Sequence, residues 1–266
     1  MHRLWRAPLA GGIHVCGCGH SGTSILTRLI GAHSGVHAIA GETGVAKKES
    51  YGRYQQALEQ FWRETQATGA QTWVEKTPKH VRHLRFILNA APDSRIVLIS
   101  REPRDCIASL SRRYGRLSKA LRRWCHDNGR VKRWRHHPQV TWLRYEDLVR
   151  DPQATLEQLM PALGLPFEPG QLHYHQQQVS WYGDQPGTGP ASGIAPASGT
   201  GPASSPAPAA CEDYGRAISH VDYRNRQINQ PLFNNTGTHE RYLSAAEIAR
   251  INRRCAALAR TLGYTL

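Results

Sequence analysis

The sequence predicts an α/β fold of three layers, in which helices cover both faces of a mostly parallel central sheet. Three observations predict it: apolar runs typical of buried strands, helical patterns between them, and a length of 266 residues, enough for one domain with a buried core. Strands and helices that alternate along a chain form such sheets. Ligands then bind beyond the carboxyl ends of the strands.

Each element has its own pattern. The apolar runs of buried strands lie at Ile13–Gly17, Thr72–Glu75, Ile96–Ser100 and Val140–Arg144. Helical patterns lie between and after them at Thr23–Ala32, Tyr51–Thr68, Pro78–Ala91, Pro103–Arg113 and near Ser118–Arg135. A closing helix is expected at Leu243–Leu262, where Ser244 is the N-cap and Glu247 completes a capping box.

One segment differs from the rest of the chain. Between residues 186 and 210 every residue except Ile194 is Pro, Gly, Ala, Ser or Thr, and Pro-Ala-Ser recurs. Such a tract has too little apolar surface to offset the entropy lost on ordering. We therefore expect a single domain over residues 1–266 with a mobile insert at 186–210.

The chain is basic, with 34 Lys and Arg against 20 Asp and Glu and a formal net charge of +14. Between Arg101 and Arg135, 12 basic residues stand against 3 acidic ones. This stretch suits nucleic acid, an anionic membrane or a small polyanionic ligand, and a solvated helix face is an equally good interpretation. No stretch approaches the roughly 18 apolar residues of a membrane helix, so a soluble cytoplasmic protein with reduced thiols is expected.

The strongest motif is Gly17-Cys-Gly-His-Ser-Gly-Thr-Ser24, which follows the first strand and opens a helix. Its glycines let successive amides point inward, and the helix N-terminus adds positive potential, so a phosphate-like group fits. The spacing is that of the P-loop G-x-x-x-x-G-K-[ST], but Thr23 replaces the lysine. A strand that holds magnesium would favour Asp where this chain has Ser100. The loop thus predicts a P-loop-like fold and disfavours ATP or GTP hydrolysis.

Two further motifs follow the other strands. Arg101 stands at a strand exit and Ser109 two helical turns beyond it, so a cationic fork and a hydroxyl are available to bind a second phosphate. Lys76 follows the second strand, where it is placed to neutralise charge on a transferred group, and Thr77 to cap the helix that Pro78 begins. Taken alone, a surface ion pair explains either cation equally well.

Together these motifs resemble the sulfotransferases that use 3′-phosphoadenosine 5′-phosphosulfate (PAPS). His20-Ser-Gly-Thr-Ser24 is similar to the loop that binds the 5′-phosphosulfate, and the spacing of Arg101 and Ser109 to that of the pair that binds the 3′-phosphate. Glu75-Lys-Thr-Pro78 resembles a segment of the carbohydrate and bacterial branches, and Leu143–Pro152 the Tyr-Glu-Asp-Leu element. The resemblance runs in order from about Ile13 to Pro166.

The resemblance implies transfer of a sulfuryl group from PAPS to a hydroxyl or amine, which leaves adenosine 3′,5′-bisphosphate (PAP) and requires no metal. It implies that the donor is bound by His20, Ser21, Gly22, Thr23, Ser24, Arg101, Ser109 and Tyr145. It implies catalytic roles for Glu42 as the base, Lys76 as the cation, and His20, which either protonates the leaving oxygen or orients it.

The chain departs from the family pattern at the catalytic centre. The family usually has Lys or Arg in place of His20, and imidazole is a cation only near or below its pKa of about 6.5, so Lys76 is the better cation. Cytosolic members carry a His base where this chain has Pro78. Glu42 is therefore the first candidate for the base, and the alternative is that it is only a solvated acid in a turn. His80 is a weaker candidate, which we expect on the helix surface.

Another departure lies near the C-terminus, where cytosolic members bind the 3′-phosphate with an Arg-Lys-Gly element. This chain has Leu232–Gly237 instead, and Arg224, Arg226 and Arg241 are the candidates to replace that element.

Two other functions stay open: a small-molecule kinase with a degenerate loop, or a non-catalytic polyanion or nucleic-acid binder. No specific nucleic acid is expected. The acceptor, whether glycan, peptide, lipid or small metabolite, is not indicated.

Overall fold

The computed structural model describes residues 11–182 and 220–266, so the low-complexity insert predicted at 186–210 lies outside the described residues. At its centre is a parallel sheet of five strands in the order β2-β3-β1-β4-β5. The strands are β1 (Ile13–Gly17), β2 (Val36–Ala38), β3 (Thr72–Lys76), β4 (Arg95–Ser100) and β5 (Val140–Arg144). The four predicted strands are confirmed to within one residue. β2 was missed because three residues are too few to show a period.

Both faces of the sheet are buried. In β1, Ile13 and Val15 pack on one face, whereas His14 and Cys16 point to the other, where His14 stacks on Tyr54. Burial on both faces explains why the strands have continuous apolar runs rather than an alternating pattern.

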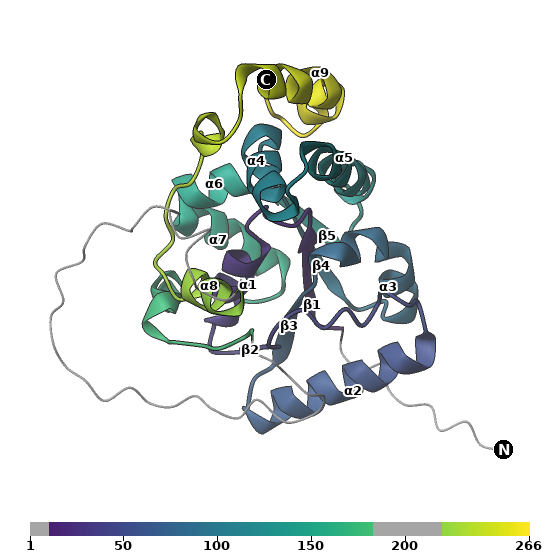
Figure 1. Cartoon of the computed structure of the whole chain (residues 1–266). Helices are drawn as coiled ribbons and strands as arrows, with labels where there is room; N and C mark the ends of the chain where they lie inside the picture. The colour runs from purple at the N-terminus through teal and green to yellow at the C-terminus, as the bar shows by residue number, and fades with distance from the viewer. Residues whose placement is uncertain (1–10, 183–219) are drawn as a thin grey trace, which may run out of the picture.

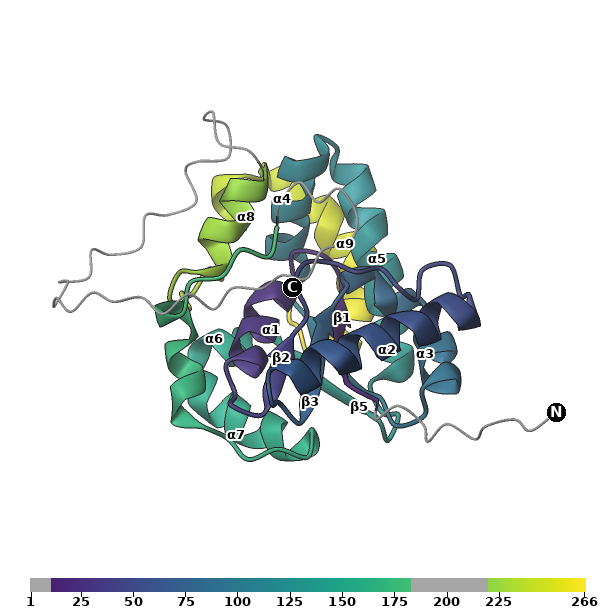
Figure 2. The same ribbon diagram turned by 90° about the horizontal axis from the view of Figure 1, so that it is seen from below.

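Helices cover the two faces, as the order of strands and helices predicts (Figure 1). The face with Ile13 is covered by α1 (Thr23–Gly31), α6 (Tyr145–Arg150) and α7 (Pro152–Ala162). The opposite face is covered by α2 (Tyr51–Ala67), α3 (Leu84–Ala90) and α5 (Leu117–Trp134). Figure 2 shows α1 and α2 on opposite sides of the strands. The three-layer architecture is therefore confirmed.

The remaining helices pack around this sandwich. α4 (Pro103–Tyr114) contacts α5 and α9 (Ala245–Thr261) at the top of Figure 1, and α8 (His220–Ile228) lies beside α1. Short 3₁₀ helices lie at η1 (Pro78–Arg82), η2 (Pro169–Gln176) and η3 (Thr238–Arg241). The capping box of Ser244 and Glu247 at the start of α9 is confirmed. No helix in the described part of the chain is long and apolar enough to cross a bilayer.

The single helix predicted at Pro78–Ala91 is wrong, because the chain forms η1 and then α3. His83 separates them with φ −119° and ψ 17°, outside the helical region. Val81, Leu84 and Ile87 are all buried, so the apolar spacing continues through the break and hides it from the sequence.

The order of the strands decides where the three motifs meet. β1 lies between β3 and β4 and is parallel to both. The loop that follows Gly17, the β3 end at Lys76, and Arg101 after β4 therefore lie at the same edge of the sheet.

Candidate active site

The loop between β1 and α1 requires glycine at two positions. Gly17 has φ 153° and Gly22, the N-cap of α1, has φ 91°. A Cβ would lie 2.2 Å from the Ile99 carbonyl oxygen at Gly17 and 2.6 Å from the ring of Tyr145 at Gly22, so no side chain fits at either position. His20 has φ 69°, uncommon for a residue with a Cβ. The loop is thus a tight turn that ends at the N-terminus of α1. The free amides and the positive end of the helix dipole there attract an anion.

A pocket opens at this loop. Most of the predicted site residues line it: Glu42, His20, Gly22, Thr23, Ser24, Arg101, Ser109 and Tyr145. The Ser21 side chain is instead fully buried, with its Oγ 3.5 Å from Cys106 Sγ, and it supports the loop from behind. Lys76 is also fully buried and reaches the site through Glu42.

One end of the pocket is formed by His20, Arg101, Ser109 and Tyr145, which we call the rear cluster. The Arg101 guanidinium lies 4.5 Å from the centre of the Tyr145 ring, and its Nη1 donates to the His20 carbonyl oxygen at 3.4 Å. His20 Nδ1 lies 2.7 Å from Ser109 Oγ. The structure therefore brings the Arg101 motif against the loop, and it turns the His20 side chain toward Ser109.

At the other end, Ser24, Glu42 and Arg224 line the pocket, and Lys76 and Tyr182 contact them; we call these five residues the front cluster. Lys76 Nζ donates to Glu42 Oε1 at 3.0 Å and to the Tyr182 hydroxyl at 2.7 Å. Burial raises the pKa of Glu42, but the positive charges of Lys76 and Arg224 outweigh it and hold that pKa below its usual range. Glu42 is therefore a carboxylate at neutral pH.

Arg224 joins this front cluster from α8. Its Nη2 donates to Ser24 Oγ at 2.9 Å and to the Tyr182 hydroxyl at 2.7 Å, and it lies 3.6 Å from Glu42 Oε1. The sequence analysis named Arg224 as a candidate to bind the 3′-phosphate, whereas its guanidinium lies beside the Ser24 hydroxyl of the loop. Arg226 is exposed and absent from the pocket lining.

Tyr182 was not found by sequence reasoning. It carries no motif and stands 158 residues from its partner Ser24, so no local pattern marks it. Burial raises the pKa of the Tyr182 hydroxyl, but Lys76 and Arg224 reverse this and lower it from its ordinary value.

The segment that replaces the Arg-Lys-Gly element forms a wall of the rear end, and Arg241, on the exposed side of η3, does not line the pocket. Leu232, Phe233 and Asn235 line the pocket there, and Arg101 Nη2 donates to the Asn235 carbonyl oxygen.

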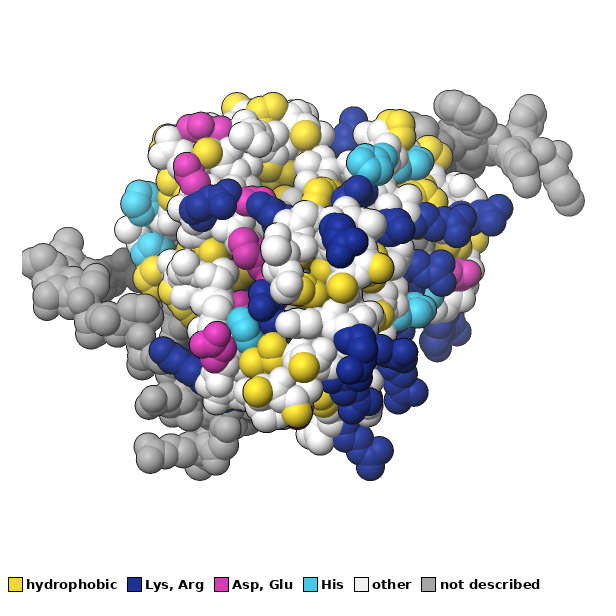
Figure 3. Space-filling model, turned by 90° about the horizontal axis from the view of Figure 1, so that it is seen from above, with side chains coloured by type: hydrophobic (Ala, Val, Ile, Leu, Met, Phe, Trp, Pro, Cys, Tyr) yellow, Lys and Arg dark blue, Asp and Glu magenta, His cyan; other side chains and the backbone are white. Residues whose placement is uncertain are grey.

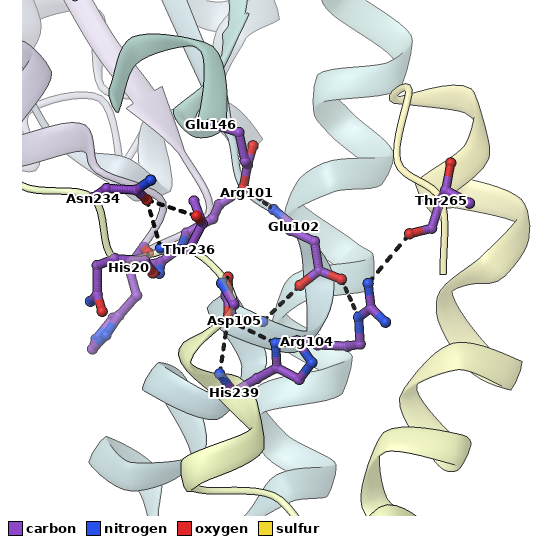
Figure 4. A network of polar contacts seen from close by, with 12 residues as sticks. His20, Arg101, Glu102, Arg104, Asp105, Glu146, Asn234, Thr236, His239 and Thr265 are labelled. Carbon is purple, nitrogen blue, oxygen red and sulfur yellow. Dashed lines mark hydrogen bonds and ion pairs between the residues drawn. The ribbon is translucent and has the colours of Figure 1, made fainter. Parts of the chain in front are cut away.

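Asp105 fixes this segment from α4 (Figure 4). Its carboxylate accepts hydrogen bonds from the Gly237 amide at 2.7 Å, the His239 amide at 3.0 Å and His239 Nδ1 at 2.9 Å. Glu102 in turn accepts from the Asp105 amide at 2.9 Å and caps α4. The helix that follows Arg101 therefore also holds the C-terminal wall.

A buried network under Glu75 holds the loop that carries Glu42. Glu75 Oε1 accepts from Thr43 Oγ1 at 2.7 Å and from Thr77 Oγ1 at 2.5 Å, and Glu75 Oε2 lies 3.2 Å from His80 Nδ1. Burial raises the pKa of Glu75, but His80 and His14 reverse this and hold it well below its usual range.

The same network corrects two expectations. Thr77 does not cap the helix at Pro78, because its hydroxyl donates to Glu75 and accepts from the Gly44 amide at 3.0 Å. His80 is fully buried rather than on the helix surface, and its Nε2 accepts from the Ala46 amide at 3.2 Å. It is therefore not placed as a base in the pocket.

Two clusters in the described residues combine carboxylate and imidazole groups that are able to ligate a metal: His14, Glu75 and His80, and Glu102, Asp105 and His239. In the first, Glu75 already accepts hydrogen bonds from Thr43 and Thr77, and in the second, Asp105 accepts three bonds from Gly237 and His239. Both clusters are therefore explained as structural networks.

The basic stretch predicted between Arg101 and Arg135 divides between the pocket and the outer surface. Arg113 and Arg123 line the pocket. Arg122 and Lys132 are exposed on α5, and Figure 3 shows Lys and Arg side chains gathered on the face seen from above. The stretch thus has one part that faces the pocket and one that faces solvent, and binding of a polyanion by it stays a prediction.

Comparison with known proteins adds what the geometry leaves open. The model of a family described as "Sulfotransferase family" matches residues 41–169. Over these residues, just under half of the chain, the protein is similar to the sulfotransferase family. The matched part contains Glu42, Lys76, Arg101, Ser109 and Tyr145, and the fold adds the Gly17–Ser24 loop to them.

Solved structures support the fold. The sulfotransferase domain of the Synechococcus PCC 7002 olefin synthase has a TM-score of 0.60 at 16% identity, over 99% of this chain and 100% of that domain. The sulfotransferase domain from the curacin biosynthetic pathway has 0.54 at 16%, over 98% and 100%. Mouse sulfotransferase SULT7A1, complexed with PAP, has 0.55 at 11%, over 96% and 85%. No curated protein matches the sequence significantly.

Proposed function

We propose that this protein is a sulfotransferase that moves a sulfuryl group from PAPS to a hydroxyl or amine of an acceptor. The observation that carries the proposal is that the helix-N-terminal loop and the Arg101–Ser109 pair line one pocket and are in contact through His20. A donor with two separate anionic ends needs two such sites side by side.

The donor is bound at both ends. Thr23, Ser24 and the amides at the start of α1 take the 5′-phosphosulfate, and Arg101 with Ser109 takes the 3′-phosphate. Arg101 Nε supports this, because it is buried without a hydrogen-bond partner in the described residues, and buried donors are rarely left unpaired. Tyr145 packs against both Gly22 and Arg101 and offers its ring to the adenosine.

The front cluster performs the transfer. The acceptor oxygen or nitrogen attacks sulfur, its proton goes to the Glu42 carboxylate, and the bond between sulfur and the bridging oxygen breaks to release PAP. Lys76 stabilises the charge that grows on that oxygen, from a buried position where electrostatic interactions are strong. His20, turned toward Ser109, orients the rear end rather than protonating the leaving oxygen. This chemistry requires no metal ion.

A thermal-shift comparison tests the function. PAP is expected to raise the melting temperature, since a ligand at about 100 times its Kd adds about 2.7 kcal/mol to folding stability. ATP with magnesium and single-stranded DNA serve as the other two arms. A larger shift with ATP and magnesium would favour a kinase, and a salt-sensitive shift with DNA alone would favour a polyanion binder.

We also propose a cytoplasmic location. Cys18 and Cys106 are free thiols whose sulfurs lie 4.0 Å apart, and the free Cys125 and Cys255 have sulfurs 3.8 Å apart. Unlinked thiols at such distances are typical of a reducing compartment.

A further inference from the structure

The loop that binds the front anion contains no Lys or Arg between Gly17 and Ser24. Its Thr23 stands where a P-loop has the lysine that reaches the terminal phosphates, and His20 turns away toward Ser109. Amides and hydroxyls alone leave most of the charge of a phosphosulfate unbalanced. The positive charge at this end must come from other segments.

Two cations from distant segments meet there. Lys76 Nζ and Arg224 Nη2 each lie 2.7 Å from the Tyr182 hydroxyl oxygen, and Ser24 Oγ lies 3.1 Å from it. Three polar groups from three elements thus surround one oxygen atom, which is the arrangement expected around an oxygen of a bound oxyanion.

Arg224 also has an unused donor. Its side chain is 13% exposed, and its Nε is buried without a hydrogen-bond partner in the described part of the chain. Arg224 Nη2 therefore bonds to Ser24, while its Nε lacks an acceptor among the described residues. A phosphate oxygen would supply that acceptor.

The charges at the front cluster leave room for an anion. Lys76 and Arg224 carry two positive charges, and Glu42, which lies 3.0 Å from one and 3.6 Å from the other, carries one negative charge. When Glu42 takes up the acceptor's proton it becomes neutral. Both cations are then left to balance the charge on the departing phosphate.

We propose that Arg224 is a donor-binding residue that supplies the cation missing from the loop and holds the 5′-phosphosulfate of the donor together with Ser24 and Lys76. This rests on the proposed function. It assigns Arg224 to the 5′ end, whereas the resemblance to the family had offered it for the 3′ end.

The test compares three nucleotides that differ only in their phosphates: PAP, adenosine 3′-monophosphate and adenosine 5′-monophosphate. Calorimetry or competition measures their Kd for the full chain and for Arg224→Gln. Arg226→Gln is the matched control, because Arg226 lies on the same helix but is exposed. Loss of charge-assisted hydrogen bonds raises the Kd of PAP and of the 5′-monophosphate about tenfold to hundredfold in Arg224→Gln.

The 3′-monophosphate decides the assignment. We expect its Kd to stay within about twofold of wild type in Arg224→Gln, because that ligand has no 5′ phosphate to lose. An equal loss for all three nucleotides, or unchanged PAP binding, overturns the proposal. If Arg224→Gln does not fold, Arg224→Lys replaces it, and it must lose affinity for PAP but not for the 3′-monophosphate. A wild-type chain that binds no PAP contradicts the proposed function itself, before any variant is compared.

Discussion

The two ends of the pocket are assembled in different ways. The rear cluster takes its residues from the first 145 positions: His20, Arg101 and Tyr145 closely follow strands β1, β4 and β5, and Ser109 lies on α4. The front cluster joins Ser24, Glu42 and Lys76 to Tyr182 and Arg224, which lie on either side of residues 183–219. The rear end is therefore fixed by the sheet, whereas the front end depends on contacts between segments far apart in the chain.

This difference has a chemical counterpart. In the proposed mechanism the rear end recognises a phosphate that does not react, and an arginine with a hydroxyl suffices for that. The front end has to bind a group, move it and accept a proton, so it holds two cations, a carboxylate and two hydroxyls. Variants of Glu42 and Lys76 at the front should therefore mainly change turnover, whereas variants at the rear, as well as Arg224→Gln, should mainly change donor affinity.

The largest effect is expected for Glu42→Gln, which removes the base. PAP release from PAPS, measured with an acceptor that the wild type uses, should fall by about 10²- to 10⁴-fold. Because its pKa is held low, Glu42 is ionised at neutral pH, and wild-type turnover should fall only as the pH drops through that lowered pKa. Glu49→Gln, an exposed neighbour paired with His83, is the control. A variant with the wild-type rate and pH profile would exclude Glu42 as the base.

A somewhat smaller effect is expected for Lys76→Ala. Loss of one preorganised cation at the leaving oxygen lowers turnover about 10²- to 10³-fold, with a smaller change in the Kd of PAP. Single-turnover kinetics and calorimetry separate the two quantities, and exposed Lys48→Ala serves as the control. If affinity fell as much as turnover, Lys76 would belong with the binding residues, and the contrast between the two ends would weaken.

The smallest of these effects belongs to the rear end. Arg101→Ala should raise the Kd of PAP about tenfold to hundredfold. The variant should still fold, with a lower melting temperature, because Arg101 also donates to the His20 and Asn235 carbonyls. Arg104→Ala removes a nearby arginine that pairs with Glu102, and its effect on binding should be negligible. Undiminished PAP binding by Arg101→Ala would remove the rear site from the mechanism.

Much of the fold could be predicted because its signals are local. Strands β1, β3, β4 and β5 have apolar runs, and the Gly17–Ser24 loop has a fixed spacing. Arg101 and Ser109 lie within one strand exit and one helix, so spacing alone brought them together. The sequence could not show the break at His83, because the buried spacing continues across it.

The front cluster could be predicted only in part. Lys76 was identified because it follows a predicted strand, at the edge of the sheet where the loop lies. Glu42 was identified through the family resemblance. The positions of Tyr182 and Arg224 depend on the path by which the chain returns to the pocket after η2. No periodic pattern in the sequence indicates that path. The hydroxyl of Thr77 was assigned to a helix cap, whereas it donates to the buried carboxylate of Glu75, which needs several hydrogen bonds to offset its burial.

The contact between Gly22 and Tyr145 has a wider consequence. The same aromatic ring touches the loop at one edge and carries the Arg101 guanidinium on its face, so in the proposed mechanism it is the spacer between the two anion sites. Even one methyl group at position 22 would push the ring outward and shift Arg101 with it. The spacing between the loop and Arg101 thus depends on a residue without a side chain.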